Sequence, residues 1–125
     1  MNQKPSILLI DDSEITVDGL KAYLDQKYEV LTAYNGLEGL KVFEENEKQP
    51  DLVITDLVMP VMSGVGVISR VKEKSPKTPI IAMTAWGEHP RAMAINAKAD
   101  MVLDKPFELE NLDRSVSKLL AATQQ

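Results

Sequence analysis

The stretch Ile7-Leu8-Leu9-Ile10-Asp11-Asp12 places four apolar residues directly before two carboxylates. A short apolar run that contains β-branched residues and does not alternate is typical of a strand covered on both faces of a parallel sheet. The stretch therefore predicts a buried first strand with two acids at its carboxyl end.

Four further segments have strand character. Residues 52–55, 80–83 and 101–103 repeat the short, nearly continuous apolar run, so we expect them to be covered on both faces as well. Residues 28–33 alternate better between polar and apolar side chains, which favours a strand at the edge of the sheet. The sequence thus predicts five strands.

The segments between the strands show the 3.6-residue period of helices. The predicted buried stripes are Val17, Leu20 and Leu24; Leu37, Leu40 and Phe43; and Leu109, Leu112, Val116 and Leu119. Two more helices are expected near residues 64–74 and 90–98, and the second is apolar all round, which indicates either deep burial or a surface kept for a partner. Five strand–helix repeats predict an α/β fold: a doubly wound parallel sheet with right-handed crossovers and helices on both faces.

Length and composition predict a single domain over residues 1–125. The chain has 14 Lys and Arg against 19 Asp and Glu, a formal charge of −5 without a basic run, which disfavours direct nucleic-acid binding. The lack of cysteine excludes disulfides and thiolate metal sites, and the single histidine nearly excludes Ser/His/Asp catalysis. Since no apolar run approaches the roughly 20 residues of a membrane span, we expect no membrane insertion and a cytoplasmic location.

Polar side chains follow four of the five strands, at the edge where ligands bind in open α/β sheets. They are Asp11 and Asp12, Asp56, Thr84, and Asp104 with Lys105. Each has an ordinary structural explanation by itself, since Asp12 or Ser13 suits a helix cap and Lys105 suits a solvated loop. Three carboxylates that converge to about 4 Å, however, repel by about 4 kcal/mol per pair at an effective dielectric of about 20, so their convergence calls for a cation.

A divalent cation and Lys105 together balance the formal charge of three carboxylates. An all-oxygen site with few carboxylates and open positions suits Mg²⁺ better than Ca²⁺ or zinc. Asp56 is then placed to attack a phosphoryl group as a carboxylate nucleophile and form an acyl phosphate. Lys105 would pair with one phosphoryl oxygen, and the Thr84 hydroxyl would donate to another.

These residues closely resemble the receiver domain of two-component response regulators. The motifs are Asp11-Asp12, the string Asp56-Leu57-Val58-Met59-Pro60-Val61-Met62-Ser63-Gly64, Thr84-Ala85 and Lys105-Pro106-Phe107, and the resemblance runs from about residue 6 to residue 120. It implies a flavodoxin-like fold with strand order 2-1-3-4-5, the order that a member of this family shows. It also implies a signalling module rather than an enzyme.

The resemblance assigns roles to the site residues. Asp56 is the phosphoacceptor, and the metal, Mg²⁺ or Mn²⁺, is held by Asp11, Asp12, Asp56 and the backbone carbonyl of Val58. The donor is a histidine kinase or a histidine phosphotransfer protein. Lys105 and Thr84 contact the phosphoryl group, Thr84 also serves as half of a switch, and a downstream protein target binds through the fourth and fifth β-α units.

The sequence departs from the family pattern at several positions. Val102 stands where the family's switch has an aromatic residue, and Trp86 is either a substitute for that residue or a partly exposed loop tryptophan. Val58 and Trp86 occupy two positions that in this family border the path of the water that attacks the acyl phosphate. Neither side chain orients a water by hydrogen bonding, which predicts slow dephosphorylation. Lys98 replaces a common glycine, and Asp104 is either a surface acid or a partner of Lys105.

Two other functions remain as alternatives to the signalling module. One is a phosphatase-like enzyme that turns over small substrates through an aspartyl-phosphate at Asp56. The other is a docking domain that is not phosphorylated and keeps the site as a relic.

Overall fold

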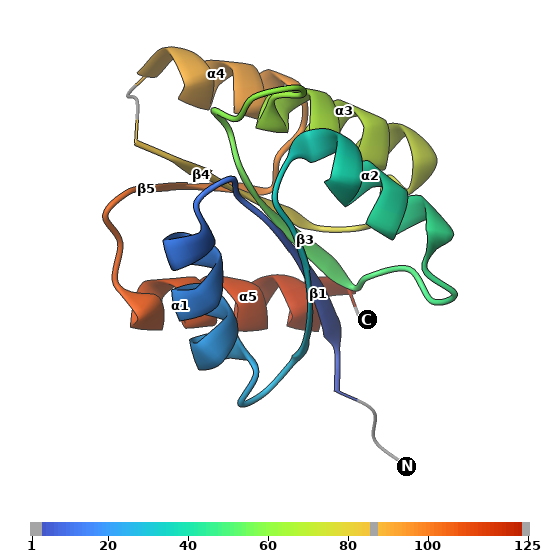
Figure 1. Cartoon of the computed structure of the whole chain (residues 1–125), viewed down its shortest axis with the longest axis vertical. Coiled ribbons are helices and arrows are strands. Elements are labelled where there is room, and N and C mark those ends of the chain that lie inside the picture. The colour runs from blue at the N-terminus through green and yellow to red at the C-terminus, as the bar shows by residue number, and fades with distance from the viewer. Residues whose placement is uncertain (1–3, 86–87, 124–125) are drawn as a thin grey trace.

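The fold is a parallel sheet of five strands that alternate with five helices. The computed structural model describes residues 4–85 and 88–123 (Figure 1). The elements are β1 (Ser6–Ile10), α1 (Glu14–Leu24), β2 (Glu29–Ala33), α2 (Gly36–Glu45), β3 (Leu52–Asp56), α3 (Gly64–Lys74), β4 (Ile80–Thr84), α4 (Glu88–Asn96), β5 (Met101–Asp104) and α5 (Leu109–Thr123). The strand order β2-β1-β3-β4-β5 confirms the doubly wound sheet that the sequence pattern predicts and the flavodoxin-like order that the family resemblance implies.

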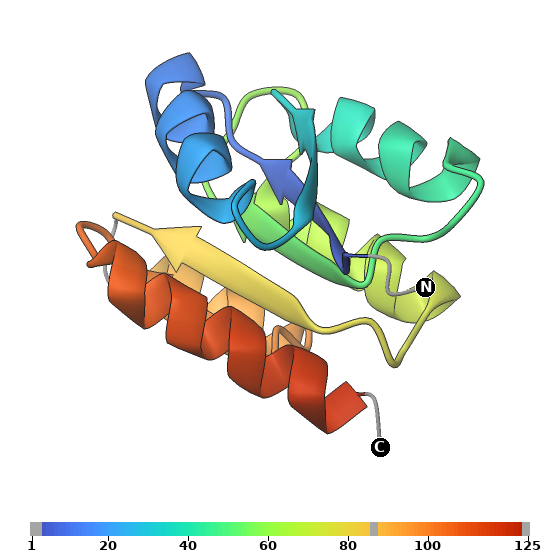
Figure 2. The same ribbon diagram turned by 90° about the horizontal axis from the view of Figure 1, so that it is seen from below.

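Two helical layers cover the sheet, α1 and α5 on one face and α2, α3 and α4 on the other (Figure 2). Because side chains of a strand alternate between faces, Ile7 and Leu9 pack toward α1 and α5, whereas Leu8 and Ile10 pack toward the opposite layer. Every residue of β1, β3 and β4 is buried. The three central strands therefore hold a fixed register, and the carboxyl ends of these strands meet at one edge.

The edges of the sheet and the helix starts correct parts of the prediction. Strand β5 is an edge strand with partly exposed side chains, so residues 101–103 are not covered on both faces as expected. Leu37 and Leu109 are exposed, because each lies in the first turn of its helix, before the helix packs over the sheet. In α5 the buried stripe is completed by Leu120, while Leu119 is only partly buried.

Helix α4 starts two residues earlier than predicted, and most of its described side chains are not buried. Ala94 is fully buried, but Met93 and Ile95 are 44% and 57% exposed. Of the two readings of its apolar composition, deep burial is therefore wrong for these two residues. Their exposure is consistent with the other interpretation, a surface kept for a partner.

A left-handed residue closes α4. The Lys98 amide donates to the Ile95 carbonyl at 2.9 Å, and the Ala99 amide donates to the Ala94 carbonyl at 3.0 Å. These are the two hydrogen bonds of a Schellman cap. Lys98 has a φ of 81°, in the region that favours glycine. The lysine at this position therefore carries backbone strain that a glycine would not.

We expect Lys98→Gly to raise the free energy of unfolding by about 0.5–1 kcal/mol, because relief of left-handed strain exceeds the entropy that glycine adds to the unfolded chain. Urea denaturation of the two proteins measures the difference. Lys98→Ala is the matched control, since it removes the same side chain without relieving the strain. Equal midpoints for Lys98→Gly and Lys98→Ala would contradict this account.

Candidate functional site

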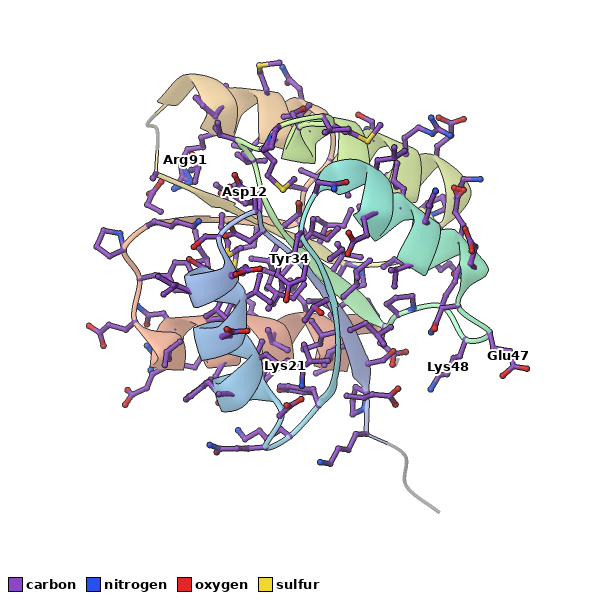
Figure 3. The ribbon with its side chains drawn as sticks, in the orientation of Figure 1. Asp12, Lys21, Tyr34, Glu47, Lys48 and Arg91 are labelled. Atoms are coloured by element: carbon purple, nitrogen blue, oxygen red, sulfur yellow. The ribbon has the colours of Figure 1, made fainter. Side chains whose placement is uncertain are left out.

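The acids predicted to converge do so at the carboxyl edge of the sheet. Asp11 and Asp12 follow β1 and Asp56 ends β3, and each offers a carboxylate oxygen within 4.8 Å of the others. Asp11 and Asp56 are buried, whereas Asp12 is exposed (Figure 3). The β1–β3 register forces this approach, because both buried strands end at the same level of the sheet.

Local hydrogen bonds orient Asp11. The Ser13 backbone amide donates to Asp11 Oδ1 at 2.9 Å, and the Ser13 hydroxyl caps α1 by accepting from the Thr16 amide at 3.3 Å. Of the two candidate caps in the sequence, Ser13 is thus the residue that fills the role. This leaves the Asp12 carboxylate at the mouth of the site.

A glycine allows the loop after β3 to fold back over Asp56. A Cβ atom on Gly64 would lie 2.0 Å from the backbone oxygen of Asp56, so no other residue fits without a shift of the backbone. The Gly64 amide also donates to the Leu57 carbonyl at 3.0 Å. The Asp56-to-Gly64 string is therefore a compact loop that fixes the position of the Asp56 carboxylate.

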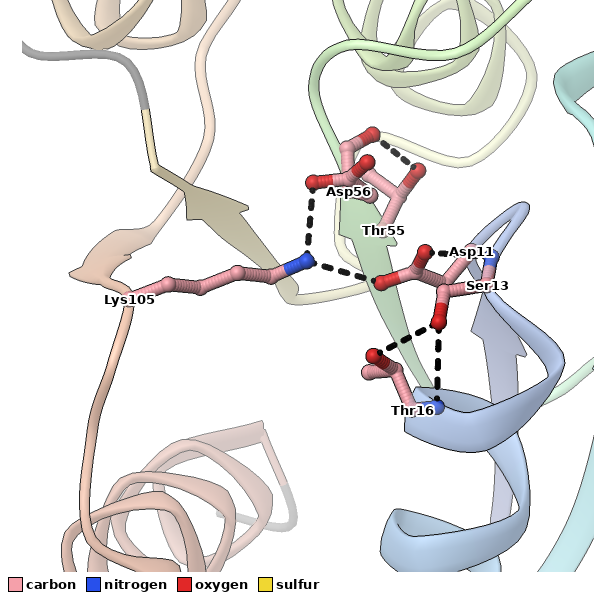
Figure 4. A network of polar contacts seen from close by, with 6 residues as sticks. All are labelled: Asp11, Ser13, Thr16, Thr55, Asp56 and Lys105. Carbon is pink, nitrogen blue, oxygen red and sulfur yellow. Dashed lines mark hydrogen bonds and ion pairs between the residues drawn. The ribbon is translucent and has the colours of Figure 1, made fainter.

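Lys105 bridges the two buried acids. The Lys105 ammonium lies 2.9 Å from Asp11 Oδ2 and 3.2 Å from Asp56 Oδ1 (Figure 4). Its own backbone amide donates to the Thr84 carbonyl at 2.7 Å, which ties the β5–α5 loop to the end of β4. Lys105 thus reaches from the edge of the sheet to its centre.

Burial and charge shift the acid–base properties of this pair. Burial raises the pKa of Asp56 above its usual value, the neighbouring Asp11 charge raises it further, and Lys105 offsets part of the shift. Burial by itself would lower the pKa of Lys105, but the hydrogen bond to Asp11 and the charge of Asp56 outweigh it and raise the pKa. The proton therefore stays on Lys105, and the ionised form of Asp56 is under-compensated.

The donor set fits a hard divalent cation. Among the described residues, Lys105 is the cation paired with this cluster, so the three carboxylates keep a formal excess of two negative charges when ionised. Carboxylate oxygens that lie together and partly open to solvent suit a small oxygen-seeking metal. The acidic pocket is consistent with the metal site that the family resemblance implies.

The structure places the switch candidates in different surroundings. Thr84 is buried at the end of β4, and Val102 is partly buried under α4. The Val58 side chain is 48% exposed beside the site. Trp86 lies outside the described residues, so the structure does not test either reading of it.

Asp104 pairs with α4. Its carboxylate lies 2.9 Å from the Arg91 guanidinium, while the ion pairs of Lys105 within the described chain go to Asp11 and Asp56. Of the two readings of Asp104, the surface acid is the one that the structure supports. Sequence reasoning missed the Arg91 pair because the two residues belong to different elements, and only their opposite charges gave a signal.

A largely apolar groove opens next to Lys105. It has a volume of about 480 Å³ and is lined mainly by α1 and the β5–α5 loop, including Ile15, Leu20, Phe107 and Leu109. Ile15 is 86% exposed in the first turn of α1. The groove thus joins an exposed apolar side chain on α1 to the edge of the charged site at Lys105.

The sequence of this chain matches a known family and several known proteins. The model of the response regulator receiver domain matches residues 7–117. The chain is 34% identical over 118 residues to the chemotaxis protein CheY of Halobacterium salinarum, covering 93% of this chain and 97% of that protein. It is 38% identical over 112 residues to the autoinducer 1 sensor kinase/phosphatase LuxN of Vibrio campbellii, covering 89% of this chain but only 13% of LuxN.

Solved structures agree with the sequence match. A response regulator receiver domain protein from Clostridium thermocellum superposes with a TM-score of 0.89 at 31% identity, covering 96% of this chain and 97% of that one. With the family match, the fold and the acidic pocket define a receiver domain of two-component signalling, whose pocket is typical of a phosphoacceptor site. The chain belongs to the family of response regulator receiver domains. None of the helices within the described ranges is both long and apolar enough to span a membrane.

Ionised Asp56 is expected to weaken the metal-free fold. Because its pKa is raised in the folded state, the folded chain binds a proton at a pH where the unfolded chain does not, so stability rises as pH falls through that raised pKa and is lower above it. Asp56→Asn should therefore raise the free energy of unfolding in EDTA at pH 7 by about 1–2 kcal/mol. It should also flatten the pH dependence below neutrality.

Urea denaturation between pH 4 and pH 8 measures both effects. Asp51→Asn is the control, because Asp51 accepts from the Ser6 amide at the opposite edge of the sheet and should lose stability instead. A metal-free Asp56→Asn protein less stable than wild type at pH 7 would contradict the electrostatic account.

Proposed function

We propose that this chain accepts a phosphoryl group on Asp56 from the phosphohistidine of a histidine kinase or a histidine phosphotransfer protein. An Asp56 carboxylate oxygen attacks phosphorus, the phosphorus–nitrogen bond breaks, and its electron pair stays on the imidazole, which takes up a proton. The observation that supports this most directly is the placement of Asp56, mostly buried, against both Asp11 and Lys105.

Each residue of the cluster has a distinct task in the proposed reaction. Asp11, Asp12, Asp56 and the backbone carbonyl of Val58 would hold Mg²⁺ or Mn²⁺, which when bound neutralises charge on phosphoryl oxygens. Lys105 supplies an ammonium that is already held beside Asp56, and buried Thr84 supplies a hydroxyl from the adjacent strand. The pKa of Asp56 is raised in the metal-free fold by burial and by Asp11, and a bound divalent cation would offset that shift and keep the carboxylate ionised for attack.

The reaction is proposed to switch the affinity of the domain for a downstream protein target. The candidate surface lies on the fourth and fifth β-α units, where Met93 and Ile95 are exposed on α4. Thr84 would sense the phosphoryl group as one half of the switch. Val102, on the α4 side, would be the other half, with Trp86 as a candidate substitute for the family's aromatic residue. A role for residues 1–125 as a single receiver domain, and a cytoplasmic location, belong to the same proposal.

Acetyl phosphate tests the proposed reaction without a partner. Incubated with acetyl phosphate and Mg²⁺, the wild-type chain should gain the mass of one phosphoryl group, and Asp56→Asn should gain none. Intact-mass spectrometry measures the gain, and the same measurement over time after the donor is removed follows the predicted slow dephosphorylation.

Other outcomes are equally informative. Many turnovers of acetyl phosphate per chain would indicate the phosphatase-like enzyme. No mass gain, together with no Mg²⁺ binding, would indicate the docking domain. A phosphate that decays as fast in wild type as in Val58→Asn, Trp86→Glu would remove the account of its lifetime.

The groove beside Lys105 is proposed to receive the phosphohistidine donor, since it is apolar and opens directly onto the site. Ile15→Asp should lower the rate of transfer from a phosphohistidine-bearing protein by about tenfold or more, because a carboxylate replaces an apolar contact. Transfer from acetyl phosphate should stay within about twofold of wild type. The test is to measure the transfer rate with each of the two donors. Ile95→Asp on α4 serves as the control. An equal loss of rate with both donors would contradict the docking role of the groove.

A further inference from the structure

We propose that Arg91 is a positioning residue of the site, which neutralises Asp104 so that this fourth nearby carboxylate does not oppose the arrival of a phosphoryl group. The inference rests on the proposed function, because it concerns the approach of an anion to Asp56. Arg91 touches neither Asp56 nor Lys105 in any described ion pair, so its action passes through Asp104.

Two contacts fix the Arg91 guanidinium at the end of β5. Arg91 Nη2 lies 2.9 Å from Asp104 Oδ2, and Nη1 donates to the Val102 carbonyl at 3.4 Å. The side chain therefore extends from α4 toward the sheet, as Figure 3 shows. A guanidinium with two partners on one strand is held more firmly than one that meets a single carboxylate.

Asp104 lies close to the reacting groups along both the strand and the sheet. It directly precedes Lys105, so the Cα atoms of the two residues are about 3.8 Å apart. It is also the register partner of Thr84 on β4, and β4 in turn pairs Met83 with Asp56 on β3. With strands about 4.8 Å apart, the backbone of Asp104 is roughly 10 Å from that of Asp56.

That separation makes charge, rather than contact, the means of action. The Debye length at physiological ionic strength is about 8 Å, so a charge at roughly 10 Å is weakened but still felt. The cluster of Asp11, Asp12, Asp56 and Lys105 already carries an excess of two negative charges when ionised. An unpaired Asp104 would add a third, which repels an incoming phosphoryl donor and attracts a metal cation.

A charge effect and a purely mechanical link between α4 and β5 predict different results for the two single variants. If the pair only anchors α4 to β5, loss of either partner breaks the same tie and shifts the site in the same direction. If Arg91 acts by neutralising Asp104, loss of Arg91 leaves a negative charge, whereas loss of Asp104 leaves a positive one. The two single variants then shift the site in opposite directions.

The experiment compares Arg91→Gln, Asp104→Asn, the double variant and Arg91→Lys in the full chain. Two quantities are measured: the rate of phosphorylation by acetyl phosphate at saturating Mg²⁺, and the Mg²⁺ affinity by calorimetry. Lys74→Gln is the matched control, because it removes one positive charge from an interhelical ion pair with Glu44 at the far end of α3.

Arg91→Gln should phosphorylate about two- to fivefold more slowly and bind Mg²⁺ more tightly, and Asp104→Asn should do the reverse. The double variant and Arg91→Lys should lie close to wild type. For the two single variants, the ratios of rate and of Mg²⁺ affinity to wild type should approach one at about 1 M salt, where the Debye length is about 3 Å. Shifts of both single variants in the same direction overturn the proposal.

An Arg91→Gln protein indistinguishable from Lys74→Gln overturns it as well. A wild-type chain that gains no phosphate overturns the proposed function instead. In that case the Mg²⁺ affinities still decide the role of Arg91, since opposite shifts of the two single variants support neutralisation of Asp104 and unchanged affinities refute it.

Discussion

The packing of three carboxylates at one edge of a buried sheet is the constraint on which the rest of this structure depends. Asp11 and Asp56 are nearly inaccessible to water, so their mutual repulsion is poorly screened. A fixed backbone holds them close, and β1 and β3 supply it, because both strands are fully buried and paired in register up to these residues. The hydrophobic core therefore stabilises an arrangement that its own charges oppose.

Lys105 relieves part of that repulsion. It follows the edge strand β5, its backbone amide binds the end of β4, and its side chain contacts the acids that follow β1 and end β3, so one residue links four of the five strands. A single ammonium leaves the cluster short of positive charge, and the raised pKa of Asp56 reflects this shortage. The same shortage that weakens the metal-free fold is what makes the cluster suited to a divalent cation.

How much of this was readable in the sequence depends on the range of the interaction. The strands and the convergence of Asp11, Asp12 and Asp56 followed from apolar runs that end in acids, because the carboxyl ends of parallel strands share one edge. The exposure of Leu37 was not readable, because the 3.6-residue period says which way a side chain faces but not where the sheet beneath it ends. Nor was the Arg91–Asp104 pair, which depends on how α4 crosses β5.

The surroundings of Lys105 differ chemically between the two faces of the sheet. On the α1 and α5 side, the neighbourhood of Lys105 is an apolar groove with Ile15 at its rim. On the α4 side, the residue before Lys105 is bound by a guanidinium. An apolar surface stabilises contact with a partner without much effect on the charge of the site, whereas a charged pair alters the charge without offering much contact area. Under the two proposals, binding of a donor and tuning of the reaction would be carried by opposite faces of one strand end, so that a substitution on either face would change one property and leave the other.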